Sequence, residues 1–198
     1  MKPHLVVPLR RVNSERAHLV ASEFAAAPSI SSDPKVGAAY AELSEQARGL
    51  FARLTTDYAR RPVRVVFTRC REPYSDAQEL SQSVRFDQVL EVVSAAHERD
   101  RQHPLLEASV GGAHDCLRAV HDIVSHGWLR YPFDRDGEYS AWHLEHRMYS
   151  GLARSALATE LHAQHSVLWT SGRLAEFKAT LLSPDLLRAS LRGGEHDD

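Results

Sequence analysis

Glutamates inside the apolar stripes of two predicted helices are the residues of this sequence best suited to chemistry. When residues are placed at about 100° per step, Glu138 and Glu145 fall inside the apolar arc of a helix predicted over 138–150. Glu160 falls near the centre of the apolar arc of a second helix, predicted over 152–170. An unpaired buried charge is very costly, so these acids require cations, protons or hydrogen-bond donors beside them. The pattern predicts that they meet around a shared positive centre.

Histidines supply further candidate ligands. His121, Asp122 and His126 belong to a helix predicted over 109–126. Asp122 and His126 stack on one another at i and i+4, off the main apolar arc, so they reach the glutamates only if this helix is packed on two sides. His146 lies at the edge of its own apolar arc and is a further candidate. The same helical wheels place three other histidines on polar, solvent-facing arcs: His143, His162 and His165.

Carboxylates and imidazoles are ligands of hard and borderline divalent cations, and facing helices of a bundle present them well. We expect a divalent metal, iron or manganese, bound as one ion with open positions or as two ions bridged by carboxylates. The candidate ligands are Asp122, His126, Glu138, Glu145 or His146, and Glu160. Gln164, one turn after Glu160, is expected to orient a ligand from outside the coordination sphere.

Two other interpretations stay open. His-Asp dipeptides, of which His121-Asp122 is one, are typical of HD-type phosphohydrolases, and His121 and Asp122 are then metal ligands. Alternatively, the chain is a non-catalytic helical domain whose buried glutamates pair with arginines such as Arg118. The 21 arginines, against 3 lysines, favour such pairs, because the guanidinium fork binds carboxylates in two-point contacts.

Three segments resemble a family of mostly uncharacterised phage and actinobacterial proteins. They are RAVHDIVSHG (118–127), DGEYSAWHLEHRMYS (136–150) and ALATELHAQHS (156–166). The family pattern is His-Asp-x-x-x-His, Gly-Glu-x-x-Ala-Trp and Thr-Glu-x-x-x-Gln. The resemblance implies that the family's polar positions are His121, Asp122, His126, Glu138, Glu160 and Gln164. It implies no established activity, and a family histidine corresponds here to Glu145 or His146.

Composition narrows the class of protein. The chain has 198 residues, 43% of them hydrophobic, and a net charge of −2, which is typical of a globular domain and disfavours a nucleic-acid partner. No apolar run approaches the roughly 18 residues of a membrane span. The two cysteines, Cys70 and Cys116, do not make a disulfide framework and fit a reducing cytoplasm.

Periodicity predicts a mainly α (α+β) fold, a helical bundle-like domain with a small sheet. We expect one domain over 1–192 and a flexible tail at 193–198. Helices are predicted at about 14–26, 34–60, 109–126, 138–150, 152–170, 173–182 and 184–192, with a short one after Ser75. Strands are predicted at 63–68 and 88–94, joined as a parallel pair or as a long hairpin.

The predicted function is a metal-dependent enzyme, a non-haem iron oxidoreductase acting on a small-molecule substrate in the cytoplasm. No membrane partner is expected, and a homo-oligomer is left open. Specific catalytic residues are not assigned from the sequence.

Overall fold

The computed structural model describes residues 8–28, 32–57, 61–97 and 102–192, so the expected tail at 193–198 lies outside the described residues. The chain is mainly helical with one small sheet, which confirms the predicted fold class. Within the described ranges, no helix combines the length and the apolar character that crossing a bilayer requires.

Local capping signals set where the first two helices begin. These elements are α1 (Ser14–Ala26), α2 (Pro34–Ala52) and the π-helical turn η1 (Arg53–Asp57) that continues α2. The side chain of Asn13 accepts a hydrogen bond from the first turn of α1, and Asp33 does the same for α2, where Pro34 occupies the first helical position. The last part of the predicted second helix, residues 58–60, lies outside the described residues.

The sheet consists of two parallel strands. The elements of this region are β1 (Arg64–Thr68), α3 (Ala77–Gln82), the π-helical turn η2 (Ser83–Asp87), β2 (Val89–Val93) and the 3₁₀ turn η3 (Ala95–His97). Arg64 of β1 is in register with Val89 of β2, and α3 and η2 form the crossover between the two strands. The parallel alternative is therefore the right one, because a hairpin would pair the strands in opposite directions.

The second half of the chain is helical and holds the candidate site. Its elements are α4 (Ala113–His121), η4 (Asp122–Trp128), α5 (Arg135–Glu145), α6 (Ala153–Leu157), η5 (Ala158–Ala163), α7 (Gln164–Ser171) and α8 (Pro184–Arg192). The turns η4 and η5 are π-helical. Each of them interrupts a helix that the sequence predicts as continuous and α-helical.

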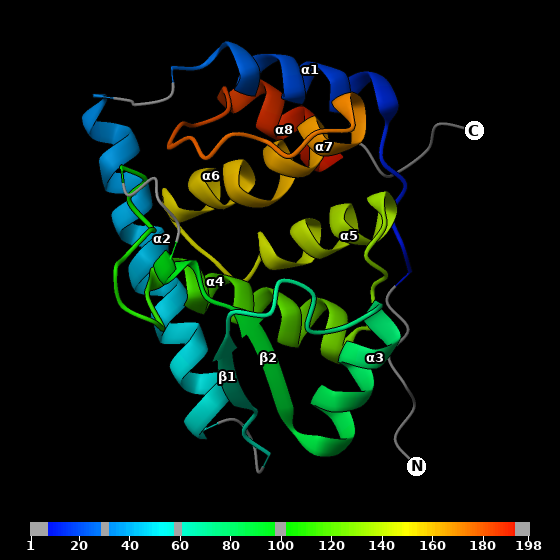
Figure 1. Ribbon diagram of the computed structural model, residues 1–198. Coiled ribbons are helices and arrows are strands. Elements are labelled where there is room, and N and C mark those ends of the chain that lie inside the picture. Colours follow the sequence, from blue (N-terminus) through cyan, green and yellow to red (C-terminus); the bar gives the residue numbers. More distant parts are fainter. Residues whose placement is uncertain (1–7, 29–31, 58–60, 98–101, 193–198) are drawn as a thin grey trace.

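These helices are stacked in layers above the sheet (Figure 1). In that view α5 crosses the middle of the molecule, with α4 below it, α6 and α7 above it, and α1 and α8 on top. Helix α2 runs down one side and packs against both α4 and α6, while α1 packs against α7. Large buried side chains of the core include Tyr40, Leu43, Ile123, Trp142 and Leu157.

Helix α5 lies in the centre of the molecule, so the expectation that one of its faces is exposed to solvent is wrong. Ser140 and His143 are buried, whereas Arg147, beyond the end of the helix, is exposed. The Ser140 hydroxyl accepts a hydrogen bond from the backbone N–H of Arg10, and His143 lies 3.3 Å from the Ser190 carbonyl of α8. The wheel assumed a surface helix, whereas the N-terminal segment and α8 cover this side.

His162 is also buried, against expectation. Its ring stacks on Trp142 of α5 with a centroid separation of 4.2 Å and an interplanar angle of 11°. The π-helical turn η5, in which His162 lies, changes the angular spacing of the side chains, so a wheel drawn at the α-helical spacing misplaces this residue.

The predicted helix over 173–182 is wrong. Gly172 adopts a left-handed conformation (φ 69°) that ends α7, and the chain then runs without regular structure to residue 183. Carbonyls of this segment bind side chains of other helices: that of Lys178 accepts from the Tyr40 hydroxyl, and that of Thr180 accepts from the Thr159 hydroxyl. These long-range contacts replace the local hydrogen bonds of a helix.

Gly137 is expected to be indispensable where α5 begins. A Cβ atom at this position would lie 2.0 Å from the carbonyl oxygen of Pro132. Alanine favours a helix over glycine by roughly 1 kcal/mol, but the steric conflict costs roughly 1–3 kcal/mol or more. Urea unfolding of Gly137→Ala should therefore show a net loss of stability.

Gly49→Ala is the matched control for that variant. Gly49 lies within α2, and nothing comes within 4 Å of a Cβ built on it. At this position only the higher helix propensity of alanine affects stability. Gly49→Ala should therefore stabilise the protein by roughly 0.5–1 kcal/mol. A Gly137→Ala protein as stable as Gly49→Ala would contradict the close approach.

Buried neutral histidines should make the metal-free protein sensitive to acid. Burial lowers the pKa of His143 to about 4 and that of His162 to about 3. The unfolded chain takes up protons near pH 6.5 and the folded one does not, so stability is complete above pH 6.5 and falls as the pH drops below it.

Each such histidine contributes about 1.4 kcal/mol per pH unit below pH 6.5. His162→Phe keeps a ring against Trp142 and removes one titrating group, so the slope of unfolding free energy against pH should decrease by about that amount. Urea titrations between pH 5 and 7.5, in the presence of a chelator, measure it. An unchanged slope would show that His162 is protonated in the folded protein.

Candidate metal centre

Three buried side chains from separate elements converge on one point. His121 ends α4, His126 lies in η4, and Glu138 lies in the first turn of α5. The two Nε2 atoms are 3.0 Å apart, and the Glu138 oxygens lie 3.2 Å from His121 Nε2 and 3.5 Å from His126 Nε2. In the described part of the chain these three form the group whose ligand atoms could hold a metal ion. We call it the His2Glu cluster.

The π-helical turn η4 brings the two histidines together. His121 and His126 are five residues apart, and in a regular α-helix a step of five residues places side chains about 140° apart. A π-helical turn closes its hydrogen bonds at i→i+5, so residues with this spacing fall on one face. A wheel drawn at α-helical spacing pairs His126 with Asp122 instead and misses the His121–His126 pair.

Each histidine of the cluster is held through its other ring nitrogen. His126 Nδ1 lies 2.7 Å from the carbonyl oxygen of Tyr131, and His121 Nδ1 lies 2.9 Å from Glu145 Oε1. A carbonyl only accepts, so Nδ1 of His126 carries a proton, and the carboxylate favours the same tautomer of His121. The Nε2 atoms, with their lone pairs, then face Glu138. Metal-binding histidines are oriented in this way by carboxylates and carbonyls behind them.

Glu145 is the anchor behind His121. It is fully buried, and besides His121 it accepts a hydrogen bond from the Ser125 hydroxyl, which lies in η4. Its second oxygen makes no hydrogen bond among the described residues. Glu145 therefore lies outside the His2Glu cluster, as a partner of one of its members.

Electrostatics around the cluster favour an anionic Glu138 and a cationic neighbour. Burial raises the pKa of Glu138, but the imidazoles of His121, His165 and His126 outweigh it, and the pKa is lowered to about 2. Burial lowers the pKa of His126. For His121 burial acts in the same direction, but Glu145 and Glu138 overcome it and raise the pKa well above its ordinary value. Without a metal, a proton on His121 thus supplies the positive charge, and a bound cation would displace it.

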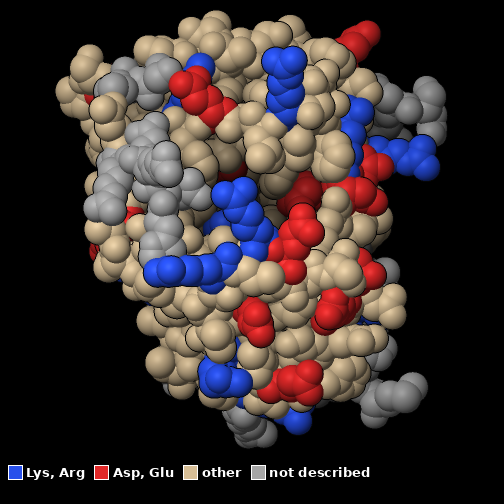
Figure 2. All heavy atoms as spheres, in the orientation of Figure 1, with Lys and Arg blue, Asp and Glu red and all other residues tan. Residues whose placement is uncertain are grey.

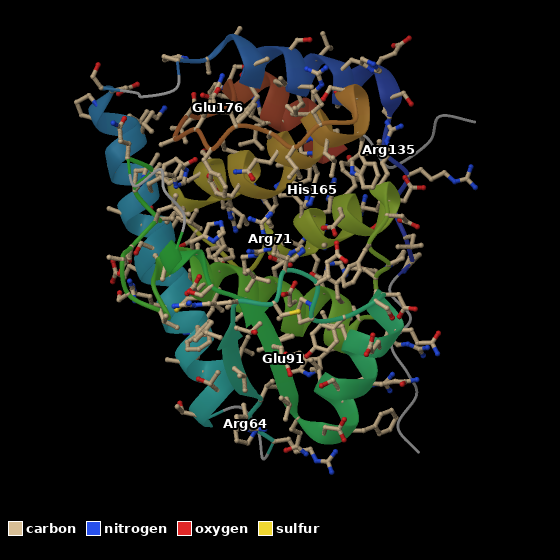
Figure 3. The ribbon with its side chains drawn as sticks, in the orientation of Figure 1. Arg64, Arg71, Glu91, Arg135, His165 and Glu176 are labelled. Carbon is tan, nitrogen blue, oxygen red and sulfur yellow. The ribbon has the colours of Figure 1, made fainter. Side chains whose placement is uncertain are left out.

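His165, which the sequence placed on a solvent-facing arc of its helix, is a neighbour of Glu138. Its Nε2 lies 3.7 Å from Glu138 Oε2, and its Nδ1 is buried without a hydrogen-bond partner among the described residues. Figure 3 shows His165 near the middle of the molecule, between the levels of α5 and of α6 and α7. Because it follows the π-helical turn η5, its direction could not be read from a regular helical wheel.

Glu160 belongs to a different cluster. Its oxygens lie 2.7 Å from the Tyr40 hydroxyl, 3.2 Å from His103 Nε2 and 3.1 Å from Gln164 Nε2. The expectation that Glu160 and Glu138 share one positive centre is not met, since Glu160 is turned toward α2 and is compensated there. Gln164 donates a hydrogen bond to Glu160, so it orients a carboxylate that lies outside the His2Glu cluster and not a ligand of it.

The remaining predicted ligands lie outside the His2Glu cluster. Asp122 is partly exposed, and it does not join its neighbour His121 in the cluster. His146 is also partly exposed, packs at the edge of the Trp142 ring, and has its pKa lowered to about 4 by burial. Arg118, the arginine proposed to pair with a buried glutamate, is exposed. The ion pairs found for Glu138, Glu145 and Glu160 are with histidines.

Comparisons with known proteins found no matching family model, no matching curated protein and no matching solved structure. What can be inferred about function therefore comes from the geometry of the His2Glu cluster.

Glu145→Gln should weaken metal binding without removing a ligand. The amide cannot hold the His121 ring as the carboxylate does, and loss of such an anchor typically lowers metal affinity by about 10–100-fold. Competition titration with a coloured chelator measures the change. Glu91→Gln is the matched control, because Glu91 is exposed on β2, away from the cluster (Figure 3). Equal affinities of the two variants would contradict the role of Glu145.

Proposed function

We propose that this protein is a metal-dependent enzyme with a single non-haem iron, ligated by His121, His126 and Glu138. The observation that carries the proposal is the meeting of two imidazole Nε2 atoms and a carboxylate in a buried site, with both Nδ1 atoms engaged elsewhere. Two histidines and one carboxylate are the donor set of non-haem iron oxygenases, which leave the other positions of the metal open.

A cation fits the cluster better than an empty site does. When Nδ1 of both histidines carries the proton, two lone pairs face each other at 3.0 Å beside a carboxylate. Glu138 Oε2 is buried and makes no well-directed hydrogen bond in the described part of the chain. These atoms repel one another unless a proton or a metal ion lies among them.

One ion is favoured over two. A second ion needs bridging carboxylates, and the candidates for that role are already engaged, Glu145 with His121 and Ser125, and Glu160 with Tyr40, His103 and Gln164. Bound iron would supply redox chemistry toward a small-molecule substrate at its open positions. The chain's own contribution is to hold both rings by their Nδ1 atoms and to exclude bulk water from the ligands.

Metal stoichiometry tests the proposal most directly. Equilibrium dialysis against iron(II) without oxygen should give one ion per chain. His126→Ala and Glu138→Ala should each lower the affinity at least 100-fold, while circular dichroism shows a folded protein. His18→Ala is the matched control, because His18 is exposed on α1.

The identity of the metal decides between redox and hydrolytic chemistry, because the same donor set also holds catalytic zinc. A spin-resonance signal from the nitric oxide complex of the iron-loaded protein would support open positions on iron. Zinc retained in preference to iron, with no redox activity, would contradict the oxidoreductase assignment. Protein that binds no divalent metal would contradict the centre itself.

A further inference from the structure

A cleft reaches the His2Glu cluster from the solvent. Counted out to its open mouth it measures about 250 Å³, and it lies among α1, α5, η5 and α7. Glu138 and His165 lie on its inner wall, and Arg135, Tyr139, Ser166 and Trp169 line the rest. This face of the molecule is hollowed near its centre (Figure 2), where Figure 3 places His165. The cleft is thus the route by which a ligand can approach Glu138.

One arginine that lines this cleft, Arg135, has a donor nitrogen without a hydrogen-bond partner among the described residues. Arg135 donates from Nη2 to the Ser14 hydroxyl at 3.2 Å, but its Nε is buried and has no hydrogen-bond partner among the described residues. Buried donors are nearly always satisfied in folded proteins, and those of a charged group are especially costly to leave unpaired. The Nε of Arg135 can therefore donate to an acceptor on a ligand in the cleft.

The charged side chains that line the cleft are Arg135 and Glu138. His162, another lining residue, is neutral, because burial above all lowers its pKa to about 3. A divalent metal on the His2Glu cluster would add one net positive charge, because Glu138 is the single anionic ligand. Arginine recognises carboxylates in a two-point geometry, which makes an anionic ligand the best match.

The size of the cleft limits the ligand. The space in the cleft that a water-sized sphere can reach has room for about one water molecule, so the cleft accepts only a small head group beside Glu138. Trp169, which is 40% exposed, and the buried Leu161 also line the cleft. These walls accommodate a ligand with a small polar head group inside the cleft and a small apolar body against Trp169.

We propose, building on the proposed metal centre, that the cleft binds a small carboxylate, with Arg135 holding its anionic group beside the open positions of the metal. The proposal defines the substrate class of the enzyme. It also makes Arg135 a binding residue that the sequence did not indicate.

Acetate and its neutral analogue acetamide test the charge requirement. In cobalt-loaded protein, acetate should shift the visible absorption of the metal with at least tenfold higher affinity than acetamide. Arg135→Gln should weaken acetate binding at least tenfold with unchanged cobalt affinity, and Arg135→Lys should restore part of it. Arg64→Gln is the matched control, since Arg64 is exposed on β1, far from the cleft (Figure 3).

A measurement on metal-free protein distinguishes the carboxylate-binding cleft from the proposed metal centre. Acetate should also shift the indole N–H resonance of Trp169, identified by its loss in Trp169→Phe, and Arg135→Gln should abolish that shift. If no metal binds but the shift persists, the metal centre is refuted and the anion cleft is supported. Equal binding of acetate and acetamide, or acetate affinity unchanged by Arg135→Gln, overturns the cleft proposal whether or not metal binds.

Discussion

The rest of the site depends on one constraint: Glu138 and Glu145 are both buried, and both contact the same histidine, His121. Two carboxylates in a dry interior require positive charge, and His121 lies between them, in contact with both. His126 adds a second nitrogen from η4, and the Tyr131 carbonyl fixes the orientation of its ring. A proton on His121 supplies this positive charge, and the cluster could hold a metal ion in its place.

Two π-helical turns give the site its geometry. In η4 the wider turn aligns His121 with His126, and η5 is followed directly by His165, which is turned toward Glu138. Such turns are less favourable than a regular α-helix and are frequent at functional sites. Both turns occur in the helices that supply polar residues to the interior. At both places the backbone departs from the regular α-helix where polar side chains enter the interior.

The two buried carboxylate clusters have different characters. Glu160 accepts hydrogen bonds from Tyr40 and Gln164 and lies 3.2 Å from His103 Nε2, and its bond with Tyr40 joins α2 to η5. Glu138 instead faces two imidazole nitrogens and a cleft that Arg135 lines with an unpartnered Nε. A satisfied network stabilises the packing of helices, whereas an unsatisfied one that a solvent cleft reaches is suited to binding. Burial alone did not distinguish the two glutamates.

Local signals in the sequence determined much of the secondary structure: the capping residues Asn13 and Asp33 start the first two helices, and β-branched runs form both strands. They also marked Glu138 as a candidate ligand, because a carboxylate in an apolar pattern must be compensated wherever it is buried. His126, which lies off the apolar arc, was a candidate only if its helix is packed on two sides. Only the tertiary structure decided that 173–182 is not helical, that Glu160 faces Tyr40, and that His121 pairs with His126. These outcomes depend on π-helical turns and on contacts between distant elements, and neither is encoded in the periodicity of a single helix.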